Sequence, residues 1–316
     1  MLNRRHLRIK VLQILYAFFQ SEGADSLSAQ KELDRSIDRI YDLYLFFLLT
    51  FEELQQIAAQ KLEDRETRVR HTVDTTIVRR NFVENRILEY FTQNSDLRKK
   101  SELRKINWKG AVRHNMMEKL FKAVQEGEVY VNYMELDDPD FQADKQFVLA
   151  LFKSDIANSK MLYDFFEEES VYWMDDIDLV CSMVLKTIKQ IDDPAEEKEI
   201  LSLYKDEEEE KEFISILLER TIEKDAENDV LIQELTQNWE LDRIAKMDFI
   251  LLKMALTELT EHSSIPKKVT LNEYIEISKF YSTPKSQMFI NGILDRAVEL
   301  LDKEGKLKKT GRGLID

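Results

Sequence analysis

The sequence contains few residues that break helices or cross-link a chain: of 316 residues, 4 are proline, 7 are glycine and 1 is cysteine. So few breaks favour long helices over an architecture of strands and turns. The single Cys181 excludes a disulfide framework and suits a reducing cytoplasm, where we expect the protein to reside. The most apolar run, Leu43 to Phe51, is about half as long as a membrane-spanning helix, so it predicts a buried helix and no membrane contact.

The residues that enzymes and metal sites need are equally sparse. Four histidines are scattered at positions 6, 71, 114 and 262, and no Cys/His spacing suggests zinc. No glycine-rich loop of the dinucleotide-binding or phosphate-binding type is present. The numerous carboxylates fall in charged runs that are typical of solvated helix faces. We therefore expect no enzyme activity, no metal ion, no cofactor and no small-molecule substrate.

Apolar residues recur with a helical period along almost the whole chain, which predicts an all-α protein. The expected helices are 4–20, 28–64, 76–93, 101–126, 141–166, 171–190, 207–225, 227–236, 240–261, 269–280 and 285–302. One internal repeat is visible: with a period of 66 residues, Phe147 aligns with Phe213 and Trp173 aligns with Trp239. The repeat indicates either a duplicated helix pair or two amphipathic pairs that resemble each other by chance.

The net charge is −15, but the charges are segregated along the chain. Residues 65–113 carry 13 basic and 6 acidic side chains, whereas residues 126–178 carry 3 and 15, and residues 192–212 carry 3 and 11. Nucleic-acid binding is therefore expected on a patch rather than over the whole surface. The basic stretch 65–113 predicts either an extended RNA track or an internal counterweight to the acidic segments.

The first residues combine a helix start with charges that oppose it. Asn3 is a good N-cap, and apolar residues recur on one face from Leu7 to Phe18. Arg4, Arg5 and Arg8 stand in the first turns, where the helix dipole makes each cation unfavourable by about 0.3–1 kcal/mol. We interpret this as a sign of an anionic partner, with nucleic-acid phosphate as the obvious candidate. The alternative is a solvated helix end with accidental arginines.

The most specific motifs lie at the two ends of the chain. The arginine-rich start is followed by Leu12-Gln13-Ile14-Leu15-Tyr16. Near the other end stand Asn272-Glu273, then Ser278-Lys279-Phe280-Tyr281, then Phe289-Ile290-Asn291-Gly292-Ile293-Leu294-Asp295. Together these motifs resemble the bacterial transcription antitermination factor NusB family. Its members open on an arginine-rich helix and close on an Asn-Glu helix and a Phe-Val-Asn-Gly-Val-Leu-Asp helix.

The resemblance implies a NusB-like helical bundle formed by residues 1–26 and 207–302. Residues 27–206 are then a large helical insertion, and residues 303–316 a flexible basic tail. Membership would imply binding of the boxA segment of ribosomal RNA leader transcripts, together with NusE, a small-subunit ribosomal protein. The expected result is an RNA polymerase that stays processive during ribosomal RNA synthesis, with no catalysis by the protein itself.

The resemblance also implies roles for single residues. Those expected to bind RNA are Arg4, Arg5, His6, Arg8, Lys279, Tyr281, Lys285, Ser286 and Phe289. Arginines pair with phosphates and stack on bases, and aromatic side chains hold unstacked bases. Tyr16 and Asp248 match positions associated with the NusE face, where an acid suits a basic partner. For Tyr16, Tyr281 and Phe289 the alternative is packing between helices.

Two other functions compete with this one. A helical adaptor would retain the NusB scaffold without RNA binding and would use its acidic insertion to hold a protein. An enzyme is the second rival, because some ribosomal RNA cytosine methyltransferases carry a NusB-like domain at their N-terminus. Such an enzyme needs a cofactor-binding α/β domain with a glycine-rich loop and a catalytic cysteine, and we expect no such domain in this sequence.

Overall fold

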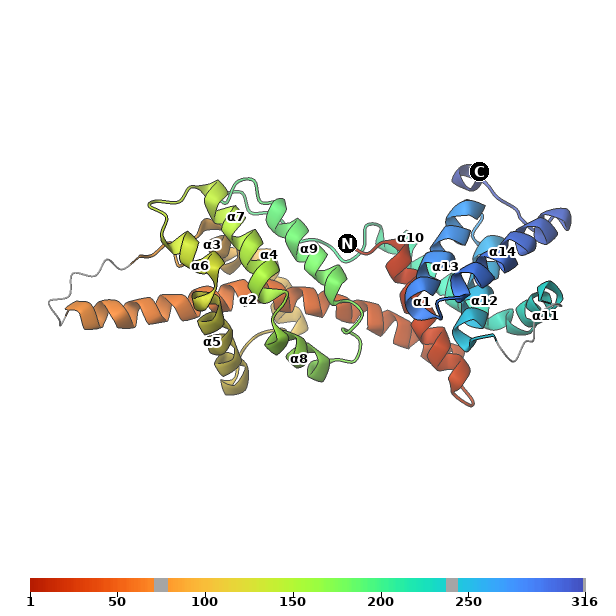
Figure 1. The fold of residues 1–316 in the computed structure, drawn as a ribbon, viewed down its shortest axis with the longest axis horizontal. Coiled ribbons are helices and arrows are strands. Elements are labelled where there is room, and N and C mark those ends of the chain that lie inside the picture. The colour runs from red at the N-terminus through yellow and green to blue at the C-terminus, as the bar shows by residue number, and fades with distance from the viewer. Residues whose placement is uncertain (71–78, 237–243, 315–316) are drawn as a thin grey trace. The chain divides into compact units, whose positions relative to one another are not determined.

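The computed structural model describes residues 1–70, 79–236 and 244–314, and every regular element in these ranges is a helix (Figure 1). The predicted all-α fold is confirmed. The chain forms two compact units: a middle unit of residues 38–203, with Met1, and a terminal unit of residues 2–37 and 204–316. The long helix α2 (Ser26–Arg70) contributes its first turns to the terminal unit and the remainder to the middle unit. None of the described helices is long and apolar enough to cross a membrane.

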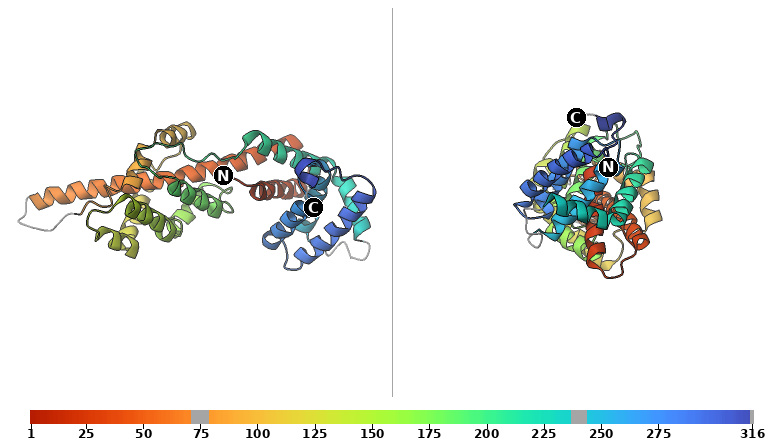
Figure 2. Two further views of the ribbon diagram at one scale, coloured as in Figure 1. Left: turned by 90° about the horizontal axis from the view of Figure 1, so that it is seen from above. Right: turned by 90° about the vertical axis from the view of Figure 1, so that its right-hand side faces the viewer.

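The terminal unit is a bundle built around α12 (Lys246–Glu261), which lies among the other helices of the unit in Figure 1. Every residue from Ile250 to Leu259 is buried, so neighbours enclose this helix instead of covering one face. It contacts α1 (Arg4–Gln20), α10 (Glu207–Glu223), α11 (Asp225–Leu235), α13 (Lys267–Tyr281) and α14 (Ser286–Lys303). The helices α13 and α14 also pack against each other, and both are drawn in blue in Figure 2.

Helix α1 spans the predicted residues 4–20. Its cap is reciprocal: Asn3 Oδ1 accepts the N–H of His6 at 3.0 Å, and His6 Nδ1 accepts the N–H of Asn3 at 3.4 Å. The apolar side chains of Leu7, Val11 and Leu15 are completely buried. They form the face that packs against α10, α12 and α13.

The middle unit contains the apolar run of α2. From Leu43 to Phe51 every residue except Leu49 is buried, as the sequence predicts. The ring of Phe46 lies 4.9 Å from that of Trp108 and 5.7 Å from that of Trp173. The other helices of this unit are α3 (Arg86–Gln93), α4 (Ser95–Arg104), α5 (Ala111–Glu126), α6 (Glu128–Met134), α7 (Phe141–Leu151), α8 (Lys160–Glu169) and α9 (Ile177–Lys189).

Two predicted helices of the middle unit have wrong boundaries. The helix predicted at 76–93 begins only at α3, because Asn85 Oδ1 caps it by accepting two backbone N–H groups at 3.0 and 3.1 Å. The part of that prediction before residue 79 lies outside the described residues. The helix predicted at 101–126 is divided into α4 and α5. Lys105 has the left-handed φ of 58° that ends α4, and Gly110, with a φ of 108°, precedes the first residue of α5.

Three further predictions need correction. The helix predicted at 141–166 is interrupted by a π-helical turn, Phe152–Ile156, between α7 and α8. The helix predicted at 171–190 begins at α9, after a turn. The helix predicted at 240–261 begins at α12, and its first residues, 240–243, lie outside the described ranges.

The helix order is compatible with the 66-residue repeat. Helices α7 and α10 begin at residues 141 and 207, α8 and α11 at 160 and 225, and α9 and α12 at 177 and 246, which are separations of 66, 65 and 69 residues. Trp239, one of the aligned aromatic residues, lies outside the described residues. The duplication therefore stays a prediction.

Candidate nucleic-acid interface

The arginines at the start of α1 have internal anionic partners. The first turn of α1 contains no acid, but neighbouring helices supply a carboxylate to each arginine, and Glu273 of α13 lies 2.8 Å from Arg5 and 3.7 Å from Arg8. Arg4 pairs with Glu209 of α10, Arg5 with Glu273 of α13, and Arg8 with Glu258 of α12. Carboxylates of the chain itself therefore compensate the unfavourable charge at this helix end.

Arg8 is part of a buried network. Its Nε and NH2 groups each donate to one oxygen of Glu258 at 2.7 Å, and the two residues are 1% and 0% exposed. Thr270 and Tyr274 of α13 donate their hydroxyl groups to the same carboxylate at 2.9 and 3.0 Å. Burial opposes the charge of Glu258, but Arg8 and these hydroxyl groups outweigh it and lower the pKa of the carboxyl. The predicted phosphate contact of Arg8 is not compatible with this burial.

Arg5 and Arg4 lie on the surface, where a ligand can compete with their carboxylate partners. Arg5 donates to both oxygens of Glu273 at 2.8 and 2.9 Å, and its side chain is 43% exposed. Arg4 pairs with Glu209, and its guanidinium lies 5.1 Å from the ring centroid of Phe213. Exposed ion pairs are worth roughly 0–1 kcal/mol, so a phosphate can replace either carboxylate at little cost.

Both exposed arginines border a surface depression of about 680 Å³ in the terminal unit. It lies between the start of α1, the turn before α13 and the first half of α13. Its lining residues are Asn3, Arg4, Arg5, Arg8, Ser264, Ile265, Pro266, Val269 and Glu273. A concave site with two guanidinium groups at its edge suits an anionic, extended ligand.

His6 has a structural function in this site. It closes the cap of α1, and burial followed by the neighbouring cations lowers the pKa of its imidazole. The ring is therefore neutral near pH 7 and contributes no charge to phosphate binding.

The second group of predicted RNA-binding residues lies at the corner between α13 and α14. Lys279 and Lys285 are exposed, Tyr281 and Phe289 are half-buried, and Ser286 is buried. Tyr281 lies eight residues beyond Glu273, the partner of Arg5, which is about 12 Å along a helix. The structure thus arranges the predicted residues as two groups on one unit, the α1 group and the corner group.

Asp248 stabilises this corner from inside. Its carboxylate accepts the hydroxyl groups of Ser282 at 2.5 Å and Ser286 at 2.7 Å, and the residue is only 4% exposed. The prediction that Asp248 presents its charge to a basic partner is not compatible with this burial. Tyr16, the other residue assigned to the partner face, is 41% exposed on α1.

Sequence reasoning missed two apolar side chains at the same corner. Phe280 is 80% exposed and Met288 is 83% exposed. Each stands directly before an aromatic residue, Tyr281 or Phe289, and the sequence does not show which of the two is exposed until α13 and α14 are packed. They add exposed apolar surface next to Lys279 and Lys285.

Basic side chains of residues 65–113 form ion pairs with carboxylates of the middle unit. Six cations of this stretch pair with carboxylates: Arg79–Asp137, Arg80–Glu66, Arg86–Asp144, Lys100–Asp96, Arg104–Asp42 and Arg113–Glu169. Its aromatic residues Phe82, Phe91 and Trp108 are at most 2% exposed. These contacts favour the internal counterweight over the extended RNA track.

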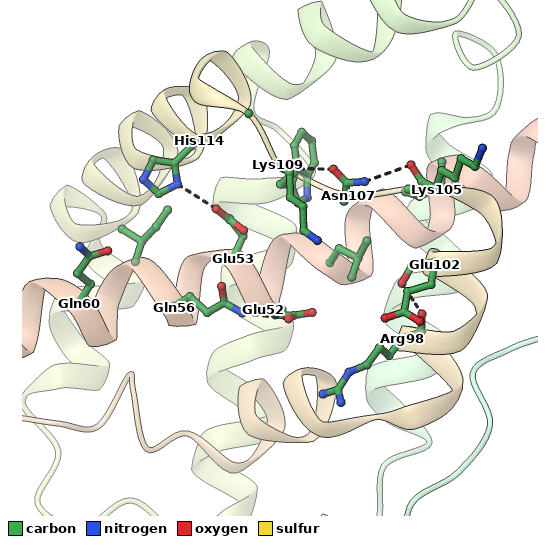
Figure 3. A pocket seen from close by; sticks show the side chains of 16 residues that line it. Glu52, Glu53, Gln56, Gln60, Arg98, Glu102, Lys105, Asn107, Lys109 and His114 are labelled. Atoms are coloured by element: carbon green, nitrogen blue, oxygen red, sulfur yellow. Dashed lines mark hydrogen bonds and ion pairs between the residues drawn. The ribbon is translucent and has the colours of Figure 1, made fainter.

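A pocket of about 730 Å³ lies in the middle unit between α2, α4 and the loop before α5 (Figure 3). Both signs of charge line it, with Glu52 from α2, Arg98 from α4 and Lys109 from the loop. Burial raises the pKa of Glu52. Among the residues that the structure describes, no group of three His, Cys, Asp or Glu side chains is arranged to hold a metal ion. Cys181 is half-buried, and burial raises the pKa of its thiol to about 12, so it is a poor nucleophile.

Comparison with known proteins gives an independent result. Residues 180–299 match the model of the NusB family. Three similar curated proteins are each named Transcription antitermination protein NusB. The protein of Salinibacter ruber is 47% identical over 95 residues, that of Chloroherpeton thalassium 46% over 88, and that of Natranaerobius thermophilus 39% over 75.

These alignments are partial on both sides. They cover 30%, 28% and 24% of this chain and 59%, 42% and 54% of the three relatives, so the chain spans about half the length of the relatives it matches. No solved structure gives a significant match. The family match begins in α9, before the predicted boundary at residue 207, and continues into α14. It includes the helices that supply Glu209, Glu258 and Glu273 to the arginines of α1. Over residues 180–299 the chain is therefore similar to the NusB family.

Proposed function

We propose that the protein is a transcription antitermination factor that binds single-stranded RNA at the start of α1. The observation that carries this proposal is the pair of surface guanidinium groups, Arg4 and Arg5, beside a depression in a unit that includes most of the region similar to the NusB family. Both groups have partly exposed carboxylate partners that a phosphate can replace. The three similar proteins are all named as antitermination proteins, which supports the same activity.

The finer proposal is binding of the boxA segment of ribosomal RNA leader transcripts. Arg4 and Arg5 would contact phosphates in the depression, and the corner group would contact the RNA farther along α13. There Lys279 and Lys285 are exposed cations, and Tyr281 and Phe289 offer aromatic edges for unstacked bases. In this assignment the RNA sequence follows from the family resemblance, and the positions of the side chains support the choice of residues.

NusE is the proposed protein partner, and the complex would act on RNA polymerase indirectly to keep it processive. Tyr16 is the exposed residue that supports this part, since its ring is accessible on α1. Aromatic side chains of this kind are frequent energetic centres of protein interfaces. Asp248 is not part of the proposed contact because its carboxylate binds Ser282 and Ser286.

Salt-dependent RNA titration tests the proposal. The full chain is titrated with a fluorescent boxA-type leader RNA, and with a scrambled RNA of the same composition, at several salt concentrations. Replacing Arg4 and Arg5 together by Ala should lower the slope of log K against log salt by about 1.4, since each lost phosphate contact removes about 0.7. Arg35→Ala is the matched control, because it removes one exposed arginine of α2 that pairs with Glu32.

Two outcomes would contradict the proposal. Equal slopes for the double variant and the Arg35 control would favour the alternative, a helical adaptor that keeps the NusB scaffold without RNA binding. Equal affinity for the leader RNA and the scrambled RNA would leave RNA binding intact but remove the boxA assignment. For the partner, Tyr16→Ala should weaken NusE binding in a pull-down titration while RNA binding by the protein alone stays unchanged.

A further inference from the structure

We propose that the segment of residues 305–314, the return segment, is an additional part of the RNA-binding surface. It folds back onto the turn between α12 and α13 and adds Lys308 to the surface that contains Arg4 and Arg5. The ligand class is the phosphate backbone of single-stranded RNA, so this inference rests on the proposed function. The sequence predicted a flexible basic tail at 303–316, but hydrogen bonds to the turn hold this segment in place.

The return segment is attached at several points. Thr310 donates its N–H to the carbonyl of Ser263 at 3.0 Å, and its hydroxyl group donates to Ser263 Oγ at 3.1 Å. Lys309 Nζ donates to the carbonyl of His262 at 3.0 Å. At the start of the segment Gly305 has a φ of 66°, the left-handed conformation that ends α14 and turns the chain back.

Gly313 shows how closely the segment approaches the turn. It is buried, and a Cβ at this position would lie 2.0 Å from the carbonyl oxygen of Ser263. The backbone of Ser263 cannot move far enough to make room for a Cβ unless the return segment separates from the turn. Only glycine therefore fits, which indicates a defined docking site for the segment.

The turn that holds the return segment also borders the arginine depression. Ser263 contacts Thr310, and the next residue, Ser264, lines the depression together with Arg4 and Arg5. The ring of His262 lies 4.8 Å from that of Phe213, over which the guanidinium of Arg4 is placed.

The electrostatics of His262 support the same proximity. Burial, opposed by Glu258, lowers the pKa of this imidazole to about 4, and the cations Arg4 and Lys309 each lower it further. The start of α1 and the return segment are therefore close to the same ring. Burial also lowers the pKa of Lys309 itself, to about 8, so its ammonium group remains mostly charged near pH 7.

Most cations around the return segment have acidic neighbours, since Glu304, Glu227 and Glu234 all raise the pKa of Lys306. Asp302 and Glu304 are balanced by Lys267 at 3.9 Å and Lys306 at 2.7 Å. Lys308 is exposed and forms no ion pair within 4 Å with any residue that the structure describes. In a protein with a net charge of −15, an exposed lysine without an acidic partner suits contact with a polyanion.

Charge reversal at Lys308 tests the inference in the full-length chain. Lys308→Glu should weaken binding of the single-stranded leader RNA by about fivefold or more at 0.1 M salt, which is the contribution of one phosphate contact with a slope of 0.7. The matched control is Lys31→Glu, which reverses another exposed lysine of the terminal unit and should leave the affinity unchanged.

A second variant removes the docking without changing the charge. Gly313→Val should detach the return segment, reduce RNA affinity to the level of Lys308→Glu, and make the segment sensitive to limited proteolysis. If Gly313→Val exposes the segment to protease but leaves RNA affinity unchanged, the inference is wrong. It is also wrong if Lys308→Glu and Lys31→Glu have equal affinities while replacement of Arg4 and Arg5 still weakens binding. If Lys308→Glu, Gly313→Val and the replacement of Arg4 and Arg5 all leave RNA binding unchanged, the proposed function itself fails.

Discussion

Replacement of Arg8 separates a structural role from an RNA-binding role for the third arginine of α1. The guanidinium and the carboxylate of Glu258 are both buried, and two hydrogen bonds of 2.7 Å join them. Arg8→Met keeps an unbranched apolar stem but leaves the carboxylate without its cation. Removal of one partner from a buried ion pair costs about 3–5 kcal/mol, and we expect a loss of stability in this range at pH 7.

Urea denaturation followed by circular dichroism measures this loss. With an m-value of about 2–3 kcal/mol per molar, the expected cost lowers the midpoint of unfolding by at least about 1 M. The double variant Arg8→Met with Glu258→Gln should recover part of the loss. An amide carries no charge and still accepts a hydrogen bond from Thr270 or Tyr274, which now donate at 2.9 and 3.0 Å.

Arg5→Met is the matched control, because Arg5 is 43% exposed and its partner Glu273 keeps a second cation, Arg8, at 3.7 Å. It should change stability by no more than about 1 kcal/mol. The reasoning would be refuted if Arg8→Met unfolded at the midpoint of the unmodified protein and had lost RNA affinity instead. That result would mean that Arg8 faces the RNA, as the sequence alone predicts.

Three further changes test other parts of the molecule. Asp248→Ala should lower the melting temperature by an amount equivalent to about 1–3 kcal/mol, because it removes the buried carboxylate that accepts from both Ser282 and Ser286. An unchanged melting temperature would contradict this structural role. The pKa of His262 is 6.5 for the free side chain and about 4 in the folded protein, so the unfolded chain binds the proton first as the pH falls. The free energy of unfolding should therefore be at its full value above pH 6.5 and decrease by at most about 3 kcal/mol toward pH 4. Urea midpoints at pH 7 and pH 5 measure this, and His262→Phe should reduce the difference between them. Arg104→Glu should lower the melting temperature because the arginine pairs with two carboxylates of α2, while the length of RNA protected in footprinting stays constant; a shorter footprint would restore the extended RNA track.

Local sequence determined most of the secondary structure. The scarcity of glycine and proline and the helical period of apolar residues predicted an all-helical protein, because both signals act within a few residues of each other. The cap at Asn3 and the apolar face of α1 placed this helix correctly at 4–20. The apolar run of α2 was likewise correctly predicted to be buried. The division of 101–126 was missed, since a left-handed Lys105 has no distinct sequence signal.

Only the tertiary structure decided which charges face solvent. The arginines of α1 meet carboxylates that are 205, 268 and 250 residues away in sequence, so no local pattern could identify these pairs. Identical residue types consequently have different roles: Arg8 is enclosed by α10, α12 and α13, whereas Arg5 remains on the surface one turn earlier. Asp248 is another case, because the serines that bind it come from the corner between α13 and α14. The sequence by itself determined that α1 is a basic, amphipathic helix. Packing determined which of its cations can reach a ligand, because burial depends on how helices distant in sequence come together.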